Sequence, residues 1–162
     1  MNATARNDRA LAAERELTIR RSFDAPRALV FKCWTEPQHL ARWSCPRGFT
    51  CTANSGELRV GGSFSASMRS PAGEEHRLRG LYREIVPPER LAFTHSWLDE
   101  RGHPGPETLV TVALTERDGR TEMTFRQTGF ESRAARDAHE EGWSSCFGLL
   151  AELLAELRSG AA

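Results

Sequence analysis

A run of short strands followed by one long helix limits the fold of this chain more than any other feature. Between residues 49 and 129, apolar and polar residues alternate in segments separated by turn residues, which is strand periodicity. The segments are 49–58, 63–70, 76–86, 90–97, 107–116 and 121–129. Strands this closely spaced predict an antiparallel meander. Asp118-Gly119 predicts a tight hairpin turn between the last two.

The chain before this run predicts one more strand and two short helices. Residues 16–23 alternate in the same way and predict a first strand, which completes the sheet. Asp24 is a candidate N-cap and Pro26 a first-turn residue of a helix that follows directly. A second short helix is expected over 36–43. The sequence therefore predicts an α+β fold with a curved seven-stranded antiparallel sheet.

The expected helix at 133–158 has a wider apolar surface than packing on a core requires. At about 100° per residue its apolar side chains cover roughly 160° of arc, against about 100° in an ordinary amphipathic helix. These side chains are Trp143, Cys146, Phe147, Leu149, Leu150, Leu153, Leu154 and Leu157. Seven antiparallel strands curl strongly, and a helix axis cannot follow that curvature. We expect one part of the arc to pack on the sheet and another to face an internal cavity.

Length and charge narrow the classes of function. The 162 residues suit a single domain, which we place at 15–160 after a disordered arm at 1–14. Basic and acidic residues are balanced at 22 each, so the chain lacks the excess positive charge that nucleic-acid binding needs. No stretch resembles a membrane span or a secretion signal, which predicts a cytoplasmic protein without membrane association.

The cysteine pattern predicts free thiols and no metal site. In the cytoplasm, Cys33, Cys45, Cys51 and Cys146 are expected to be reduced. Their spacing matches no zinc motif, and neither a metal nor a cofactor is expected. One alternative stays open, because Cys45 and Cys51 are close enough in sequence to meet across a turn.

Three stretches together resemble a known family. They are RSFDAPRALVFKCWTEPQHLARW, GELRVGGSFSASMRSPAGEEHRLRGLYREIVPPERLAFTHSW and the helix start HEEGW. In this order they are similar to the SRPBCC superfamily, also called START-like or helix-grip, and within it to the branch named after the activator of the heat-shock protein 90 ATPase. The similarity covers about residues 16–158.

The resemblance implies a hydrophobic cavity between the curved sheet and the C-terminal helix. Members of the superfamily include carriers of hydrophobic molecules, polyketide cyclases and dehydratases, hydrolases and a co-chaperone domain. Many relatives pair, so a homodimer is one expectation. The sequence shows no counterpart of the N-terminal domain with which the eukaryotic activator docks, which argues against a chaperone as partner.

The candidate ligand-binding residues share apolar character and an expected position on the inner face. They are Trp43, Phe64, Met68, Phe93, Trp97, Met123, Phe125, Trp143, Phe147 and Leu150, together with the polar His95 and His139. The two histidines are also the best catalytic candidates. His95 points either into the cavity or to the outer face, and His139 is either a cavity anchor or a helix-start histidine bonded to the backbone. The direction of the Tyr82 hydroxyl is open as well.

Three functions follow as hypotheses. The first is binding of a small hydrophobic or aromatic ligand in the cavity. The second is a polyketide cyclase- or dehydratase-like enzyme that uses a cavity histidine as acid or base. The third is a co-chaperone-type stimulator of a chaperone ATPase.

Overall fold

The computed structural model describes residues 3–160. Its elements are α1 (Ala3–Glu14), β1 (Glu16–Phe23), α2 (Arg27–Thr35), α3 (Pro37–Trp43), β2 (Thr50–Gly56), β3 (Ser63–Arg69), β4 (Glu75–Val86), β5 (Arg90–Leu98), β6 (Thr108–Arg117), β7 (Arg120–Thr128) and α4 (Arg133–Arg158). The strands form one antiparallel sheet in the order β1-β7-β6-β5-β4-β3-β2. The α+β prediction, with two short helices between strands 1 and 2, is confirmed.

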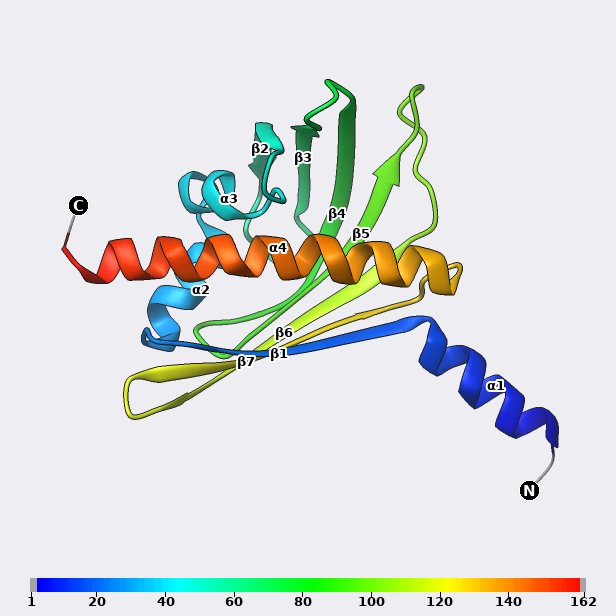
Figure 1. The fold of residues 1–162 in the computed structure, drawn as a ribbon, viewed down its shortest axis with the longest axis horizontal. Helices are drawn as coiled ribbons and strands as arrows, with labels where there is room; N and C mark the ends of the chain where they lie inside the picture. Colours follow the sequence, from blue (N-terminus) through cyan, green and yellow to red (C-terminus); the bar gives the residue numbers. More distant parts are fainter. Residues whose placement is uncertain (1–2, 161–162) are drawn as a thin grey trace.

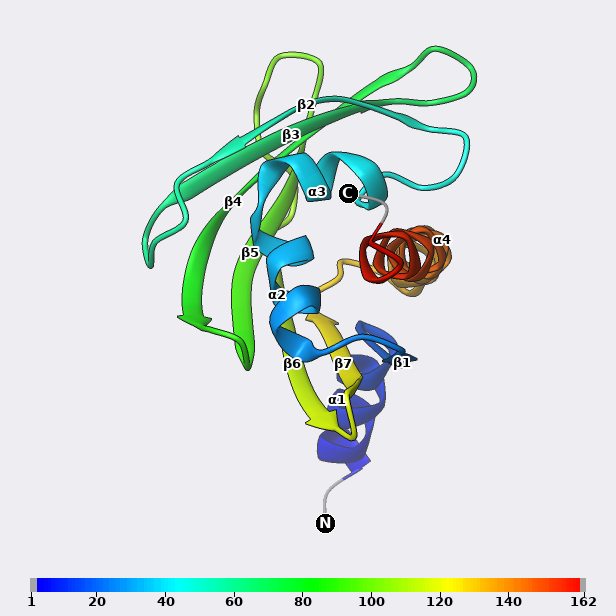
Figure 2. The ribbon, with the colours of Figure 1, turned by 90° about the vertical axis from the view of Figure 1, so that its left-hand side faces the viewer.

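The sheet curves around the long C-terminal helix in the manner of a grip. Figure 1 shows α4 crossing the sheet, and Figure 2 shows the helix end-on with the strands arched around it. α4 has the bounds that the sequence predicts, and Ser132 caps its start by accepting a hydrogen bond from the Ala135 N–H at 3.1 Å. The predicted β6–β7 hairpin is also present, with Asp118 and Gly119 both at positive φ.

Residues 3–14 differ from the disordered arm that the sequence predicts for 1–14, of which residues 1 and 2 lie outside the described part of the chain. Ala3–Glu14 is an α-helix, although none of its described residues is buried. Figure 1 shows α1 projecting away from the sheet. The residues of this segment are polar and small, which suggested disorder, but its Ala, Arg and Leu residues are strong helix formers.

The start of α2 also differs from the prediction, because Asp24 is not its N-cap. Pro26 occupies that position, and its carbonyl accepts the Leu29 N–H at 3.0 Å. Asp24 instead pairs with Arg158 at the end of α4, at 3.0 Å. This pair joins the last turn of α4 to the β1–α2 connection, and so helps to fix the helix across the sheet.

Candidate functional site

A cavity of about 870 Å³ lies between α3, the strands β2 to β5 and the first half of α4. Its wall is mainly apolar and aromatic, which is typical of pockets for small molecules. Eight predicted residues line it: Trp43, Phe64, Met68, Phe93, His95, Trp97, His139 and Trp143. The curled sheet and the wide apolar arc of α4 therefore leave a hollow between them, as the sequence predicts, and this hollow is partly open to solvent.

The prediction that Met123, Phe125, Phe147 and Leu150 also line the cavity is wrong. All four are at most 1% exposed and belong to the packed core. Phe125 of β7 and Phe147 of α4 pack edge to face, with ring centroids 5.2 Å apart. The helix thus packs directly on the β1–β7 side of the sheet and leaves the hollow only on the β2–β5 side.

Several wall residues were absent from the predicted set. Trp34 of α2 and Tyr82 of β4 are buried and line the cavity, as do Leu78 and Ala66. Period-2 alternation along β4 would have found Leu78 and Tyr82, since both lie on the face of the strand that the cavity uses. The open question about Tyr82 is therefore answered, because its ring points inward.

His95 faces the cavity from β5 and is only 6% exposed. Its ring accepts no hydrogen bond from, and donates none to, another residue within 3–160. Burial, reinforced by the nearby His139 ring at 5.9 Å, lowers the pKa of His95 to about 4. The ring is therefore neutral at pH 7; one of its nitrogens interacts with the backbone of His95 itself, and the other can hydrogen-bond to a ligand.

His139 has both ring nitrogens occupied by protein. The Trp97 indole N–H donates to His139 Nε2 at 2.9 Å, and Nδ1 lies 2.7 Å from the Ala135 carbonyl oxygen. An indole nitrogen can only donate, so Nε2 is the acceptor and the proton sits on Nδ1. Of the two interpretations of His139, the backbone-bonded histidine fits the structure, although the ring also lines the cavity.

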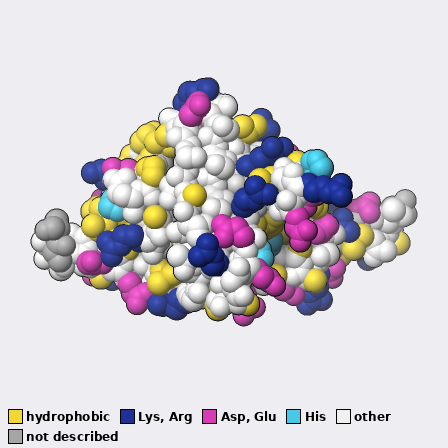
Figure 3. Space-filling model, turned by 90° about the horizontal axis from the view of Figure 1, so that it is seen from above, with side chains coloured by type: hydrophobic (Ala, Val, Ile, Leu, Met, Phe, Trp, Pro, Cys, Tyr) yellow, Lys and Arg dark blue, Asp and Glu magenta, His cyan; other side chains and the backbone are white. Residues whose placement is uncertain are grey.

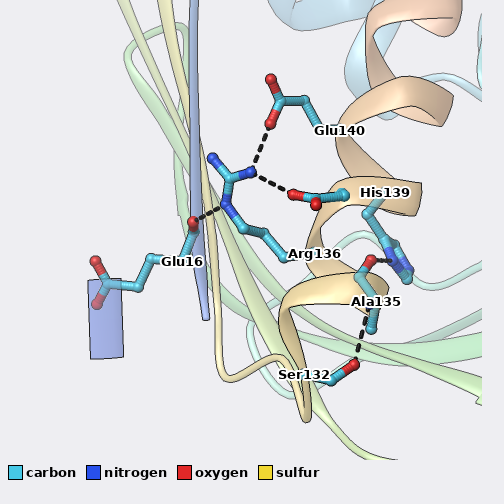
Figure 4. A network of polar contacts seen from close by, with 7 residues as sticks. Glu16, Ser132, Ala135, Arg136, His139 and Glu140 are labelled. Carbon is cyan, nitrogen blue, oxygen red and sulfur yellow. Dashed lines mark hydrogen bonds and ion pairs between the residues drawn. The ribbon is translucent and has the colours of Figure 1, made fainter. Parts of the chain in front are cut away.

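The turn of α4 that carries His139 is held against the sheet by its neighbours. Arg136 Nε donates to the Glu16 carbonyl oxygen of β1 at 2.7 Å, and its guanidinium pairs with Glu140 at 2.8 Å (Figure 4). The Ala135–His139 contact lies in the same turn of α4 (Figure 4). These bonds fix the first turns of α4 relative to the sheet, and hence the position of the His139 ring beside the cavity.

A buried polar chain connects α4 with three strands behind the cavity. The Trp143 indole N–H donates to Gln127 Oε1 at 2.8 Å, and Gln127 Nε2 donates to Thr108 Oγ1 at 2.8 Å. Thr108 in turn donates to the His95 carbonyl oxygen at 3.2 Å. Gln127 is fully buried, so each of its bonds replaces water that cannot reach it. We did not predict that Gln127 is buried, because a polar residue in a strand is usually assigned to the solvent-exposed face.

Replacing Gln127 by leucine is expected to lower the free energy of unfolding by about 2–3 kcal/mol, because it leaves the Trp143 N–H and the Thr108 hydroxyl buried with a partner lost. Urea denaturation followed by tryptophan fluorescence measures the effect. Gln38→Leu is the matched control, since Gln38 is exposed and should lose almost nothing. If the two variants were equally stable, the buried hydrogen bonds of Gln127 would not stabilise the fold, and this interpretation would be wrong.

The loop between α3 and β2 is fastened over one end of the cavity. Cys45 and Cys51 form a disulfide, which corrects the prediction that all four cysteines are free; their Cα atoms are 5.9 Å apart, within disulfide range. Cys33 and Cys146 are free and buried, as expected. Between the bonded cysteines, the Arg47 N–H donates to Ser145 Oγ at 3.0 Å and its guanidinium pairs with Glu152. The loop is thus joined to both β2 and α4.

On the face seen from above, the charged side chains are not gathered into one patch (Figure 3). Viewed from above, charged side chains of both signs are interspersed with separate hydrophobic patches (Figure 3). Within residues 3–160, no three or more His, Cys, Asp or Glu side chains are grouped so that they could hold a metal ion. None of the described helices is both long and apolar enough to cross a membrane.

The fold and the cavity define a helix-grip, START-like domain. The family model described as "Activator of Hsp90 ATPase homolog 1-like protein" matches residues 24–155, and the chain belongs to this family. This confirms the resemblance to that branch of the SRPBCC superfamily. A comparison with curated protein sequences finds no match.

Solved structures share the fold over most of this chain. A crystal structure of a protein from Chromobacterium violaceum is 26% identical, with a TM-score of 0.80 over 86% of this chain and 96% of that one. A solution structure from Arthrobacter aurescens is 30% identical, with a TM-score of 0.79 over 90% and 88%. A crystal structure titled as the AHSA1 protein of Silicibacter pomeroyi is 25% identical, with a TM-score of 0.78 over 86% and 97%.

Proposed function

We propose that this protein binds a small hydrophobic, aromatic molecule in the cavity between the sheet and α4. The observation that carries the proposal is the hollow of about 870 Å³ with its aromatic wall. Each methylene-sized group that moves from water into such a wall contributes about 0.8 kcal/mol, so a ligand of modest size gains useful affinity. The few polar groups would then orient it. A homodimer and a cytoplasmic location stay predictions.

Filling the cavity tests the proposal. Ala66 of β3 lines the hollow, and Ala66→Trp is expected to weaken binding of the neutral fluorescent probe N-phenyl-1-naphthylamine at least about tenfold, because the indole takes the space of the ligand. Ala72→Trp, on the exposed β3–β4 turn, should bind like the unmodified protein. Absence of probe binding to the unmodified protein, or equal binding by Ala66→Trp, would refute ligand binding in this cavity.

The alternative, a cyclase- or dehydratase-like enzyme, rests on His95 in the same cavity. An acid–base catalyst works best when its pKa lies near the working pH. The pKa of His95 is lowered by burial to about 4, which makes the ring a weak proton acceptor at neutral pH. This favours anchoring over proton transfer. The co-chaperone alternative is supported only by the name of the family.

A further inference from the structure

We propose that the cavity selects an uncharged aromatic ligand over an anion of the same shape, and that His95 supplies the hydrogen bond that orients this ligand. The inference rests on the proposed function and adds its charge specificity. It is argued from three features of the cavity wall: the polar groups that already hydrogen-bond within the protein, those that do not, and the charged side chains nearby.

Most polar groups of the aromatic wall are already used by the protein. The indole N–H groups of Trp43, Trp97 and Trp143 donate to the Cys33 carbonyl, His139 Nε2 and Gln127 Oε1, at 2.8, 2.9 and 2.8 Å. The Trp34 N–H has no partner within 3–160 but is enclosed by protein, so a ligand cannot reach it without rearrangement. These groups shape the wall and leave little polarity for a ligand.

Two buried side chains of the wall, His95 and Tyr82, have polar groups open to the hollow, and both are neutral. Neither the His95 ring nor the Tyr82 hydroxyl hydrogen-bonds to another residue of the described chain, and neither is sealed from the cavity. Burial raises the pKa of Tyr82 and lowers that of His95, so each keeps its uncharged form at pH 7. Each can exchange one neutral hydrogen bond with a ligand, and neither offers a positive charge.

The charged groups on the cavity wall are unfavourable for an anion. Glu36 is half-buried, and its Oε2 has no hydrogen-bond partner among residues 3–160; His39 Nε2 lies 3.7 Å from it, beyond hydrogen-bond distance. Glu141 adds an exposed carboxylate at the rim. The arginine of the wall, Arg47, is paired with Glu152. The wall also contains His76, which lies 3.8 Å from Glu74. A carboxylate that entered the hollow would lose water and meet like charge, while Arg47 and His76 already have acidic neighbours, so its entry is costly.

A matched pair of ligands tests the charge specificity. 1-Naphthaleneacetamide and 1-naphthaleneacetate differ little in shape, and each can displace the neutral probe N-phenyl-1-naphthylamine. We expect the amide to bind at least about tenfold more tightly than the acid at pH 7.5. If the probe binds but the acid competes as well as the amide, the charge specificity is wrong while ligand binding stands. If the probe itself does not bind, the proposed function fails.

Two substitutions then assign the specificity to residues. Glu36→Gln should tighten binding of the acid several-fold and leave the amide unchanged, whereas Glu131→Gln, which is exposed and away from the wall, should change neither.

For His95, binding of 2-naphthol is compared with binding of 2-methylnaphthalene, which lacks the hydroxyl. The preference for naphthol should fall about 3- to 10-fold in His95→Phe and persist in His95→Asn, since one neutral hydrogen bond has about that effect. An unchanged preference in His95→Phe would remove His95 as the anchor.

Discussion

Replacing Gly80 by alanine is expected to lower the free energy of unfolding by about 3 kcal/mol or more, because β4 has no room for even one methyl group at this position. A Cβ at Gly80 would lie 1.9 Å from the Thr94 carbonyl oxygen and 2.5 Å from Cζ of Phe64. The Phe64 ring could rotate away, but the carbonyl is backbone of the neighbouring strand. β4 and β5 would therefore have to separate where they carry Tyr82 and Phe93 into the hollow.

Thermal and urea denaturation measure this loss, with Gly105→Ala as the matched control. A Cβ at Gly105 would make only one contact, of 3.4 Å with the Trp97 carbonyl oxygen, which is ordinary packing. Gly105→Ala should therefore stay within about 0.5 kcal/mol of the unmodified protein. If the Gly80→Ala variant were as stable as this control, β4 and β5 would be able to shift and accept the methyl group at little cost in stability.

The order of elements could be predicted from the sequence because each signal is local. Alternation gave the strands, the Asp118-Gly119 pair gave the last hairpin, and apolar periodicity gave α4. The helical state of residues 3–14 was missed because we inferred disorder from polar and small residues that form no apolar stripe. Such a stripe reports whether a helix packs on a core, while intrinsic propensity reports whether it forms.

The direction of the His95 side chain could not be predicted from the sequence, because neither face of its strand is exposed to solvent around this residue. From Leu91 to Ser96 every residue of β5 is buried, including the small Thr94 and Ser96 on the outer face. Alternation assigns a face only where one side of a strand meets water. The inward position of His95 follows from the pairing of β5 with β4 and β6, which is a long-range property.

The division of the apolar arc of α4 into core and cavity is also a three-dimensional property. The helical wheel places Phe147 and Leu150 on the same stripe as Trp143, yet only Trp143 reaches the hollow. The crossing of α4 over a curved sheet decides which turn touches strands and which spans empty space. Likewise, the Cys45–Cys51 disulfide depends on how the α3–β2 loop returns; the argument from cellular compartment favoured free thiols and left this pairing only as an alternative.

The protein is expected to lose up to about 3 kcal/mol of stability as the pH falls from 7 to 4, because of His95 alone. In the unfolded chain this imidazole has the ordinary pKa of 6.5, whereas burial, with a smaller effect of His139, lowers it to about 4 in the folded protein. Below pH 6.5 the His95 imidazole therefore binds a proton in the unfolded state but not in the folded state, so the equilibrium shifts toward unfolding. Above pH 6.5 neither state binds it, and the contribution of His95 is flat.

Urea denaturation at pH 7.5 and pH 5 tests this linkage, since about 2 kcal/mol of the loss should appear between them, before most carboxylates titrate. His95→Asn has no imidazole in either state, so it should lose correspondingly less stability over the same interval. His103→Asn, which removes an exposed histidine, should keep the slope of the unmodified protein. A His95→Asn slope as steep as that of the His103 variant would show that the His95 ring accepts a proton readily in the folded state. In that case the wall would present a cation in mild acid, and the argument for an uncharged ligand would hold only near neutral pH.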